Sequence, residues 1–435
     1  MPPVHPSFLD DATPSNPART DRFGFQTHQP FSPTRAQISA RKENKRLLKW
    51  IKLLAPTNDA WDQLEPKPNK KISQAQRRRI KRRIYKGIPE PMRCIVWQVV
   101  SGCRAAIRQG QDVARLQGGY DALKSRALAG GSDCSTYIPQ HTDNQINLDL
   151  PRTFPRHILW SSPSDRDSRD DGGGDDDDAT SKWHPASGTI GERDEPTTES
   201  GAFENESEKV TTPSPLDTVG TMSLESQSGS PMKPRHHCSI GEEHLYTLLR
   251  MYATYDTDVQ YCQSMNFIGG MLLMYLPIEQ AFSLFSHLLV GLDFRRLYLP
   301  GLPLLRECLD ELTFQIKRCL PRLAKHLVRA GIESSLFATQ WFLTLGLDQL
   351  QFSLAIRLVD LIFYERCLTP IFRFALALLR KCQSSLIQKR DSTELMYALR
   401  RLSESVDDVD SFISTEVMRT KLARLSNAKL KKYIR

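Results

Sequence analysis

The stretch Ile146-Asn147-Leu148-Asp149-Leu150-Pro151-Arg152-Thr153-Phe154-Pro155 decides how the rest of the chain is interpreted. Ile146, Asp149 and Arg152 recur at intervals of three, so on a helix Ile146 and Asp149 lie near one face. Pro151 has no N–H to donate and tends to end a helix or redirect the chain. The pattern predicts a turn anchored by Ile146, with an acidic side chain beside it and Arg152 projecting from the helix end. On spacing alone, an ordinary surface arginine after a helix is the simpler interpretation.

A second stretch, Tyr261-Cys262-Gln263-Ser264-Met265-Asn266, follows an apolar helical run and favours a functional interpretation of Arg152 over that of an ordinary surface arginine. Three further motifs accompany these two stretches: Lys86-Gly87-Ile88-Pro89 with Arg93 and Trp97, then Gln340-Trp341-Phe342, and Arg357-Leu358-Val359-Asp360. Together with Ile146 to Pro155 and Tyr261-Cys262-Gln263, they make the chain resemble the TBC family of Rab GTPase-activating proteins, of the RN-tre-like or fungal Ypt/Rab type. Each motif alone is weak evidence, whereas five in the family's order, over roughly Arg83 to Leu402, are specific.

The resemblance implies an all-α TBC domain built from two packed helical subdomains. It implies that Arg152 is an arginine finger and that Gln263 is a glutamine finger, which replaces the water-positioning glutamine of the GTPase. It further implies that Asp149 orients the arginine loop through hydrogen bonds, that Ile146 anchors this loop, and that Tyr261 packs behind the glutamine loop and places it. The residues expected to be structural are Trp97, Trp341, Arg357 and Asp360.

These two side chains suit the chemistry of GTP hydrolysis. An arginine stabilises the charge spread over the transferring phosphoryl group, and its planar fork reaches two oxygens at once. A glutamine amide accepts a hydrogen bond from the attacking water while it donates one to a phosphate oxygen. The resemblance therefore implies a Rab-family GTPase in its GTP state as the partner, with a role in vesicle traffic. The GTP and the Mg²⁺ would be bound by the partner, and the chain would have no cofactor and no metal of its own.

The glutamine stretch departs from the family pattern at two positions. Gln260 and Ser264 stand where the family usually has glycine on both sides of the motif, and glycine permits positive φ and close backbone approach. This departure supports an alternative function, a TBC-shaped binding module that docks a Rab or another partner without accelerating hydrolysis. Other departures affect packing rather than chemistry; they are Cys94, Gly346 and Val359.

The composition of the chain limits the classes of protein to which it can belong. The chain has 435 residues, 40% hydrophobic residues and a net charge of +9, and none of its nine cysteines forms a CxxC pair. These features predict buried thiols in a reducing compartment rather than a disulfide or zinc scaffold. The N-terminus shows no signal peptide, and the apolar stretch 266–292 is interrupted at Pro277, which predicts two helices rather than a membrane span. We therefore expect a cytoplasmic protein, with any peripheral association with endomembranes made through the partner.

Composition also changes along the chain. We expect a Pro/Ser-rich disordered N-terminus (1–35), a basic helical lead-in (36–85), a first domain part (86–160), an acidic disordered insert (161–238), a second domain part (239–402) and a charged C-terminal tail (403–435). The insert has a net charge of about −10, typical of disorder. Within the N-terminus, Asp21-Arg22-Phe23-Gly24-Phe25 resembles a short segment that precedes the domain in RN-tre-like proteins.

Several local signals have competing interpretations. The basic run Arg77 to Arg83 suits a solvated helix, a nucleic-acid contact or an anionic lipid surface, and we favour the solvated helix. Cys262 is a buried thiol rather than a nucleophile, because no motif places a histidine beside it. His236-His237-Cys238 lacks a second ligand pair, and four consecutive aspartates on a flexible chain, Asp175 to Asp178, do not supply converging metal ligands.

Helical signals follow the second stretch to near the C-terminus. Ser239-x-x-Glu242 fits a capping box, and Pro321 predicts a break in a long apolar run. Further helices are expected over about 334–347, 352–365, 370–386 and 391–402. No alternation of period two bounded by hairpin turns is present in the sequence, so the predicted fold class is all-α.

Overall fold

The computed structural model describes residues 20–26, 33–54, 74–129, 138–160 and 239–434. Within these ranges the chain is helical, and extended pairing is limited to two isolated bridges, Thr20 with Gln26 and Phe25 with His157. The prediction of an all-α fold is confirmed. The expected acidic insert, 161–238, and most of the expected disordered N-terminus lie outside the described residues.

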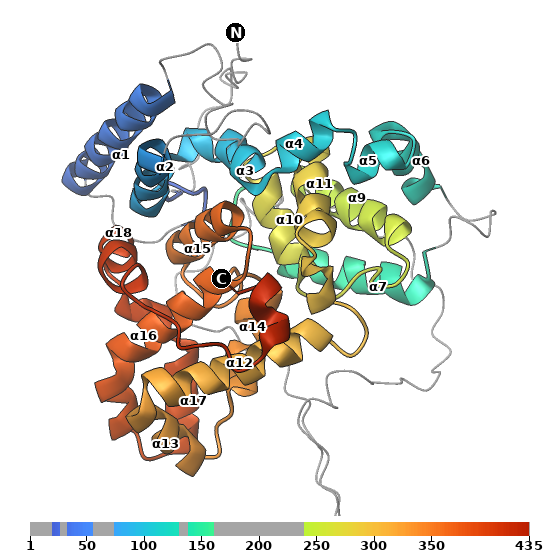
Figure 1. The fold of residues 1–435 in the computed structure, drawn as a ribbon. Coiled ribbons are helices and arrows are strands. Elements are labelled where there is room, and N and C mark those ends of the chain that lie inside the picture. The colour runs from blue at the N-terminus through green and yellow to red at the C-terminus, as the bar shows by residue number, and fades with distance from the viewer. Residues whose placement is uncertain (1–19, 27–32, 55–73, 130–137, 161–238, 435) are drawn as a thin grey trace, which may run out of the picture. The chain divides into compact units, whose positions relative to one another are not determined.

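The first group of helices gathers around α9 (Ile240–Tyr255), which is yellow-green in Figure 1. It packs against α6 (Tyr120–Leu128), α7 (Gln140–Asp149), α10 (Met265–Leu273) and α11 (Ile278–Ser286). Shorter elements complete this group: the 3-10 turns η2 (Glu90–Met92), η3 (Leu150–Arg152) and η5 (Phe294–Leu297), the π turn η4 (His287–Gly291), and α3 (Arg93–Ser101), α4 (Cys103–Arg108) and α5 (Val113–Leu116).

The second group gathers around α15 (Phe352–Glu365) and α16 (Thr369–Gln388), which pack against each other. Beside them lie α12 (Pro303–Cys319), α13 (Pro321–Arg329), α14 (Ser334–Leu343) and α17 (Ser392–Arg400). The lead-in forms α1 (Pro33–Leu54) and α2 (Gln74–Lys86), and α2 packs on α15.

A buried polar cluster joins the two groups where α3 packs on α15. The Asp360 carboxylate accepts hydrogen bonds from Trp97 Nε1 (2.8 Å), Arg93 Nε (3.2 Å) and Arg357 Nη1 (2.8 Å). All four side chains are buried. Burying charge is costly unless it is paired and hydrogen-bonded, so this cluster requires the two groups to meet in one arrangement. The expected pair of Arg357 and Asp360 is present and belongs to this larger cluster.

The local helix signals in the sequence are confirmed. The Ser239 hydroxyl accepts a hydrogen bond from the Glu242 N–H (3.2 Å) at the start of α9. Pro321 begins α13 directly after the end of α12, because a proline ring cannot continue the preceding helix. Pro277 likewise separates α10 from α11.

The last thirty or so residues extend the domain instead of forming a separate charged tail, which corrects our expectation for 403–435. They form η6 (Leu402–Ser405), α18 (Val409–Phe412), the π turn η7 (Ile413–Val417) and η8 (Ala428–Lys432). Charged residues are frequent in this segment, but the intervening apolar side chains Phe412, Ile413, Val417, Leu430 and Tyr433 are all buried. The segment is therefore part of the folded domain.

Candidate functional site

The arginine loop begins where α7 ends. Ile146 is completely buried and fixes the last turn of α7, while Asp149, its final residue, is also buried. The chain then makes the 3-10 turn η3, which ends at Arg152. The Arg152 side chain is 59% exposed, and its guanidinium lies 3.8 Å from the Asp149 carboxylate. The turn therefore presents an arginine to solvent from a rigid base.

The glutamine loop connects α9 to α10. Gln263 is exposed at its tip. Gln260 and Ser264, the residues that stand in place of glycines, both have positive φ, at 51° and 96°. L-residues adopt this region at a cost, so the loop keeps a backbone that glycine would adopt more easily.

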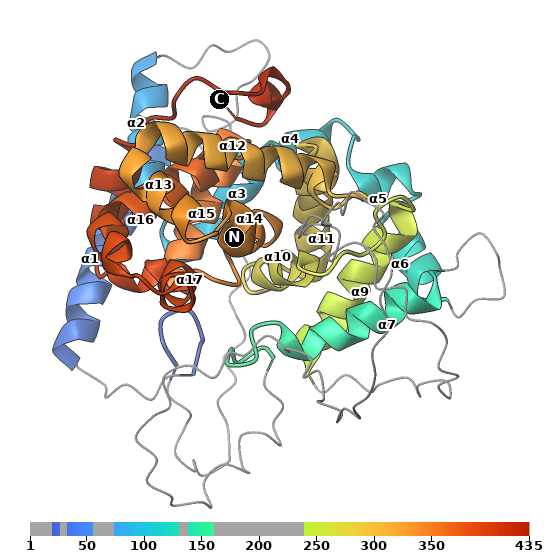
Figure 2. The ribbon, with the colours of Figure 1, turned by 90° about the horizontal axis from the view of Figure 1, so that it is seen from below.

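Hydrogen bonds tie the two loops to each other. The Tyr261 hydroxyl donates a hydrogen bond to the Asp149 carboxylate (2.7 Å). Tyr261 therefore contacts the arginine loop directly, whereas we expected it to pack behind the glutamine loop. Asn266, on α10, donates to the Thr153 hydroxyl (2.8 Å) and accepts from the Ser264 N–H (3.2 Å). Arg152 and Gln263 consequently project from two loops that share one buried polar network. Figure 2 shows the supporting helices α7, α9 and α10 as neighbours.

Burial shifts the pKa values of the ionisable side chains in and beside this network. Burial raises the pKa of the Asp149 carboxyl, and hydrogen bonds from Tyr261 and Gln145 oppose this rise. Burial and the nearby Asp149 charge raise the pKa of Tyr261, so its hydroxyl stays protonated as a donor. Burial also raises the pKa of the Cys262 thiol to about 11, which makes it a poor nucleophile at neutral pH.

Two side-chain hydrogen bonds hold the non-glycine positions of the glutamine loop. The Thr142 hydroxyl, on α7, donates to the Gln260 amide oxygen (2.7 Å). The Ser264 hydroxyl donates to the Gln340 amide oxygen on α14 (3.2 Å). We did not predict Thr142, Gln340 or Asn266 as site residues, because each joins a loop to a helix or loop that is distant in sequence. The departure from glycine at 260 and 264 was the signal that could have prompted a search for them.

The segment 20–26, which we expected inside a disordered N-terminus, packs on the arginine loop. The His157 ring binds the Phe23 carbonyl (2.8 Å), and the Phe25 ring packs edge-on against both His157 and Phe154. Gly24 has φ 92° and leaves no room for a Cβ, which would lie 2.7 Å from His157 Nε2. The aromatic side chains supply the burial that orders this short segment.

The remaining predicted residues lie away from the two loops. Trp97 and Trp341 are buried in α3 and α14, and Arg357 and Asp360 belong to the cluster that joins the helix groups. Within the described residues no group of three or more His, Cys, Asp or Glu side chains could hold a metal ion. His236-His237-Cys238 lies outside the described residues.

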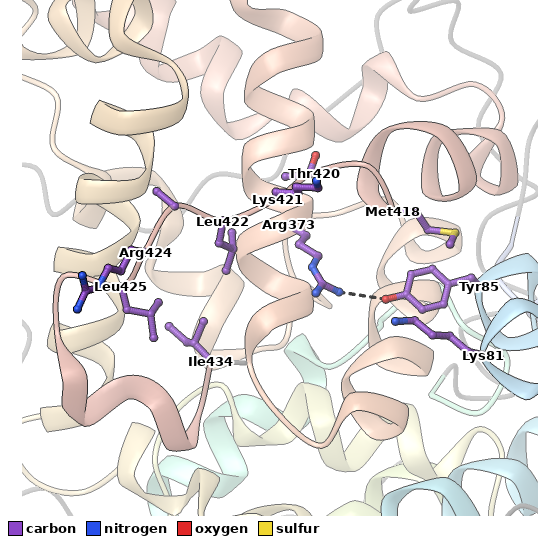
Figure 3. Close-up of a pocket in the computed structure, with 11 residues that line it drawn as sticks. Lys81, Tyr85, Arg373, Met418, Thr420, Lys421, Leu422, Arg424, Leu425 and Ile434 are labelled. Atoms are coloured by element: carbon purple, nitrogen blue, oxygen red, sulfur yellow. Dashed lines mark hydrogen bonds between the residues drawn. The ribbon is translucent and has the colours of Figure 1, made fainter. Parts of the chain in front are cut away.

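A pocket of about 500 Å³ lies between α2 and the C-terminal segment, and Figure 3 shows its lining. Arg373 in this pocket hydrogen-bonds to the Tyr85 hydroxyl (3.0 Å) and pairs with Glu365 (2.8 Å). The charge of this arginine is already compensated, and Arg152 and Gln263 do not line the pocket. The two loops, which form an exposed surface, are therefore the better candidate site.

Comparison with known proteins gives the class of the domain. Residues 194–387 match the family model described as the Rab-GTPase-TBC domain. This range includes Gln263, whereas Arg152 precedes it. Two solved structures share the fold. The Chlamydomonas flagellar RabGAP TBC domain has a TM-score of 0.55 and 20% sequence identity, and the match covers 91% of this chain and 98% of that one. The Ypt/Rab-GAP domain of Gyp1p has a TM-score of 0.53 and 16% sequence identity, and the match covers 86% of this chain and 97% of that one. Residues 194–387 therefore match the Rab-GTPase-TBC domain, and the described residues have the fold of these two TBC domains.

Curated relatives agree with this assignment. The human protein named ecotropic viral integration site 5 protein homolog is 36% identical over 34% of this chain and 18% of its own length. The GTPase-activating protein GYP5 of Saccharomyces cerevisiae is 34% identical over 34% of this chain and 17% of its own length. The Rab GTPase-activating protein tbc-11 of Caenorhabditis elegans is 34% identical, with 34% and 16% covered. The chain thus spans less than a fifth of the length of these relatives.

None of the helices in the described part of the chain combines the length and apolar character needed to cross a membrane.

Proposed function

We propose that the chain is a GTPase-activating protein for Rab-family small GTPases and supplies Arg152 and Gln263 in trans. The observation that carries the proposal is that both side chains are exposed on loops joined by the bond from Tyr261 to Asp149. Relatives named as GTPase activators support it. The GTP and Mg²⁺ would belong to the partner, and this chain would contribute only side chains and positioning.

In this mechanism Arg152 reaches into the active site of the GTPase and stabilises charge on the transferring phosphoryl group. Gln263 accepts a hydrogen bond from the attacking water and donates to a phosphate oxygen. Both groups act on charge that develops in the transition state, so they raise the rate more than the affinity. Asp149 positions Arg152, Ile146 anchors its loop, and Tyr261 fixes the spacing between the two loops.

The test is single-turnover GTP hydrolysis by a panel of Rab proteins, with and without this chain. Arg152→Ala is expected to lower the stimulated rate by roughly 10³-fold or more, since an arginine supplied in trans is worth about 10³–10⁵. Gln263→Ala is expected to lower the stimulated rate as well, because the attacking water loses the group that orients it. Arg322→Ala and Gln109→Ala change exposed residues of the same types outside the two loops and should leave the rate unchanged. Full activity of folded Arg152→Ala across the panel would contradict the proposal.

The alternative is a binding module that docks a Rab or another partner without accelerating hydrolysis. The observation in its favour is the positive φ of Gln260 and Ser264, where bulkier side chains replace glycine near the exposed loop tip. Restoring glycine at both positions discriminates between the two functions. A large gain in rate with unchanged binding would favour the binding module, whereas no gain would remove its main support.

A further inference from the structure

Helix α1 is held on the domain by one face. Trp50 is completely buried, and its Nε1 donates a hydrogen bond to the Gly87 carbonyl (2.9 Å). Arg46, one turn earlier on the same face, pairs with Asp410 of α18 and with Glu43 (2.9 Å). Lys42 pairs with Asp410 as well (3.3 Å). The inner face of α1 is therefore fixed and electrically balanced.

The opposite face of α1 has a different composition. Arg41, Lys45, Leu48 and Lys52 follow one another at steps of four, three and four residues, so they form a line along the helix on the side away from Trp50. Leu48 is 59% exposed, and the neighbouring Ile51 is 46% exposed. Figures 1 and 2 both show α1 at the outer edge of the described helices. This face presents two large aliphatic side chains among cations.

Helix α2 extends the positive charge of this face. Slight desolvation and the nearby positive charges of Lys45, Arg83 and Lys86 lower the pKa of Lys49. The end of α2 lies against α1, because Trp50 bonds to the carbonyl of Gly87, the residue that follows α2. Cations of the two helices are therefore close enough to repel one another. Among the described residues, none of the cations of this patch forms an ion pair with a carboxylate; they are Arg41, Lys45, Lys49, Lys52, Arg79, Arg82, Arg83 and Lys86.

The carboxylates near α1 do not offset this charge. Glu43, Asp408 and Asp410 lie on the anchored side of the helix, where they pair with Arg46 and Lys42. The outer patch thus combines uncompensated lysines and arginines with exposed aliphatic residues. This is the composition of helices that lie in the interface of an anionic bilayer, with cations at the headgroups and aliphatic side chains among the upper acyl chains.

We propose that the outer face of α1, flanked by the cations of α2, binds the surface of a bilayer rich in anionic lipids. Leu48 and Ile51 favour a membrane over a nucleic acid, because exposed aliphatic side chains gain from acyl chains and gain little from a phosphate backbone. Two such residues and a short cationic stripe give weak, reversible binding that depends on salt. The contact is made by this chain itself and does not depend on a partner GTPase.

The test is sedimentation of the full chain with vesicles of phosphatidylcholine alone, or of phosphatidylcholine with phosphatidylserine. We expect binding only to the anionic vesicles, and weaker binding at high salt. Lys45→Glu/Lys49→Glu/Lys52→Glu should weaken binding more than about 10-fold, because each cation near the surface contributes separately. Leu48→Ser/Ile51→Ser should weaken it several-fold with the charge unchanged.

Residues on other helices supply matched controls. Lys317→Glu/Arg318→Glu/Lys381→Glu reverses three exposed cations of α12 and α16, and Leu116→Ser/Leu128→Ser removes exposed aliphatic side chains of α5 and α6. Both control sets should bind anionic vesicles like the parent chain. Equal binding by the α1 variants and the parent would overturn the proposal. So would a duplex DNA that binds as tightly as the anionic vesicles and is insensitive to Leu48→Ser/Ile51→Ser.

The same variants separate this proposal from the proposed GTPase activation. GTP hydrolysis by a soluble, lipid-free Rab should be unchanged in the α1 variants, since they lie outside the two loops. Vesicle binding should in turn be unchanged in Arg152→Ala. Far-ultraviolet circular dichroism and a melting curve for each variant establish that a loss of binding reflects the surface and not unfolding.

Discussion

Ser264 holds a backbone conformation, φ 96°, that favours glycine, while its hydroxyl bonds to Gln340. These two effects oppose each other, because the Cβ strains the backbone and the hydroxyl stabilises the loop. Substitution by alanine keeps the strain and removes the hydrogen bond. Substitution by glycine removes both. Comparing the two variants therefore isolates the backbone strain at the edge of the glutamine loop.

We expect Ser264→Ala to be less stable than the parent by about 1 kcal/mol, the usual net value of one hydrogen bond. Ser264→Gly should be more stable than Ser264→Ala by roughly 1 kcal/mol, because glycine adopts positive φ at little cost. Urea unfolding of the three proteins measures both differences. Equal stability of the two variants would mean that the loop relaxes to negative φ when the hydroxyl is lost.

At the scale of the helix, the sequence predicted helix positions and helix ends, because these depend on residues that are close in sequence. Helix α15 has the bounds expected from its apolar pattern, and Ser239 and Pro321 mark helix boundaries by local chemistry. The sequence did not predict the bonds of Thr142 to Gln260 or of Asn266 to Thr153, because each joins residues more than a hundred positions apart. Motifs in the sequence therefore singled out Arg152 and Gln263, whereas the hydrogen bonds that link their loops were found only in the structure.

The turn between α14 and α15 holds a half-buried carboxylate, Asp348, whose Oδ1 is buried and has no hydrogen-bond partner among the described residues. Burial raises the pKa of Asp348 to about 6. The folded chain thus holds this proton more tightly than the unfolded chain does. Stability consequently falls as the pH rises from the ordinary carboxyl pKa of 3.8 through about 6, and it stays lower above that.

Asp348→Asn removes this ionisation. At about pH 7.5 the free energy of unfolding should rise by up to roughly 3 kcal/mol, since each pKa unit corresponds to about 1.4 kcal/mol. At about pH 4 the gain should vanish, because the parent carboxyl is then protonated in the folded state. Urea unfolding at the two pH values tests this, with the exposed Asp310→Asn as control. A gain that is equal at both pH values would contradict the assigned cause.

At the scale of the whole molecule, the arginine loop and α9 meet although 161–238 separates them in sequence. A Cβ added at Gly241 would lie 2.4 Å from the Leu159 carbonyl oxygen, so the two chain segments are in direct contact. Trp160 is buried at the end of one segment, and Ser239 caps α9 at the start of the other. Contacts among the described residues therefore fix the two positions, 160 and 239, between which 161–238 runs.

Replacing 161–238 by a Gly/Ser linker of about six residues is accordingly expected to preserve the fold, a length that suits helix connections. The domain should gain roughly 2 kcal/mol at most, because each halving of a loop lowers the closure cost by about 0.6 kcal/mol. Thermal unfolding tests the fold, and single-turnover GTP hydrolysis with Arg152→Ala in the shortened chain tests the site. If the shortened chain unfolds, 161–238 contributes contacts that hold the two segments together. If it folds but its stimulated rate falls, this segment acts on the proposed reaction itself, since Asp149, Tyr261 and Asn266 would still join the two loops.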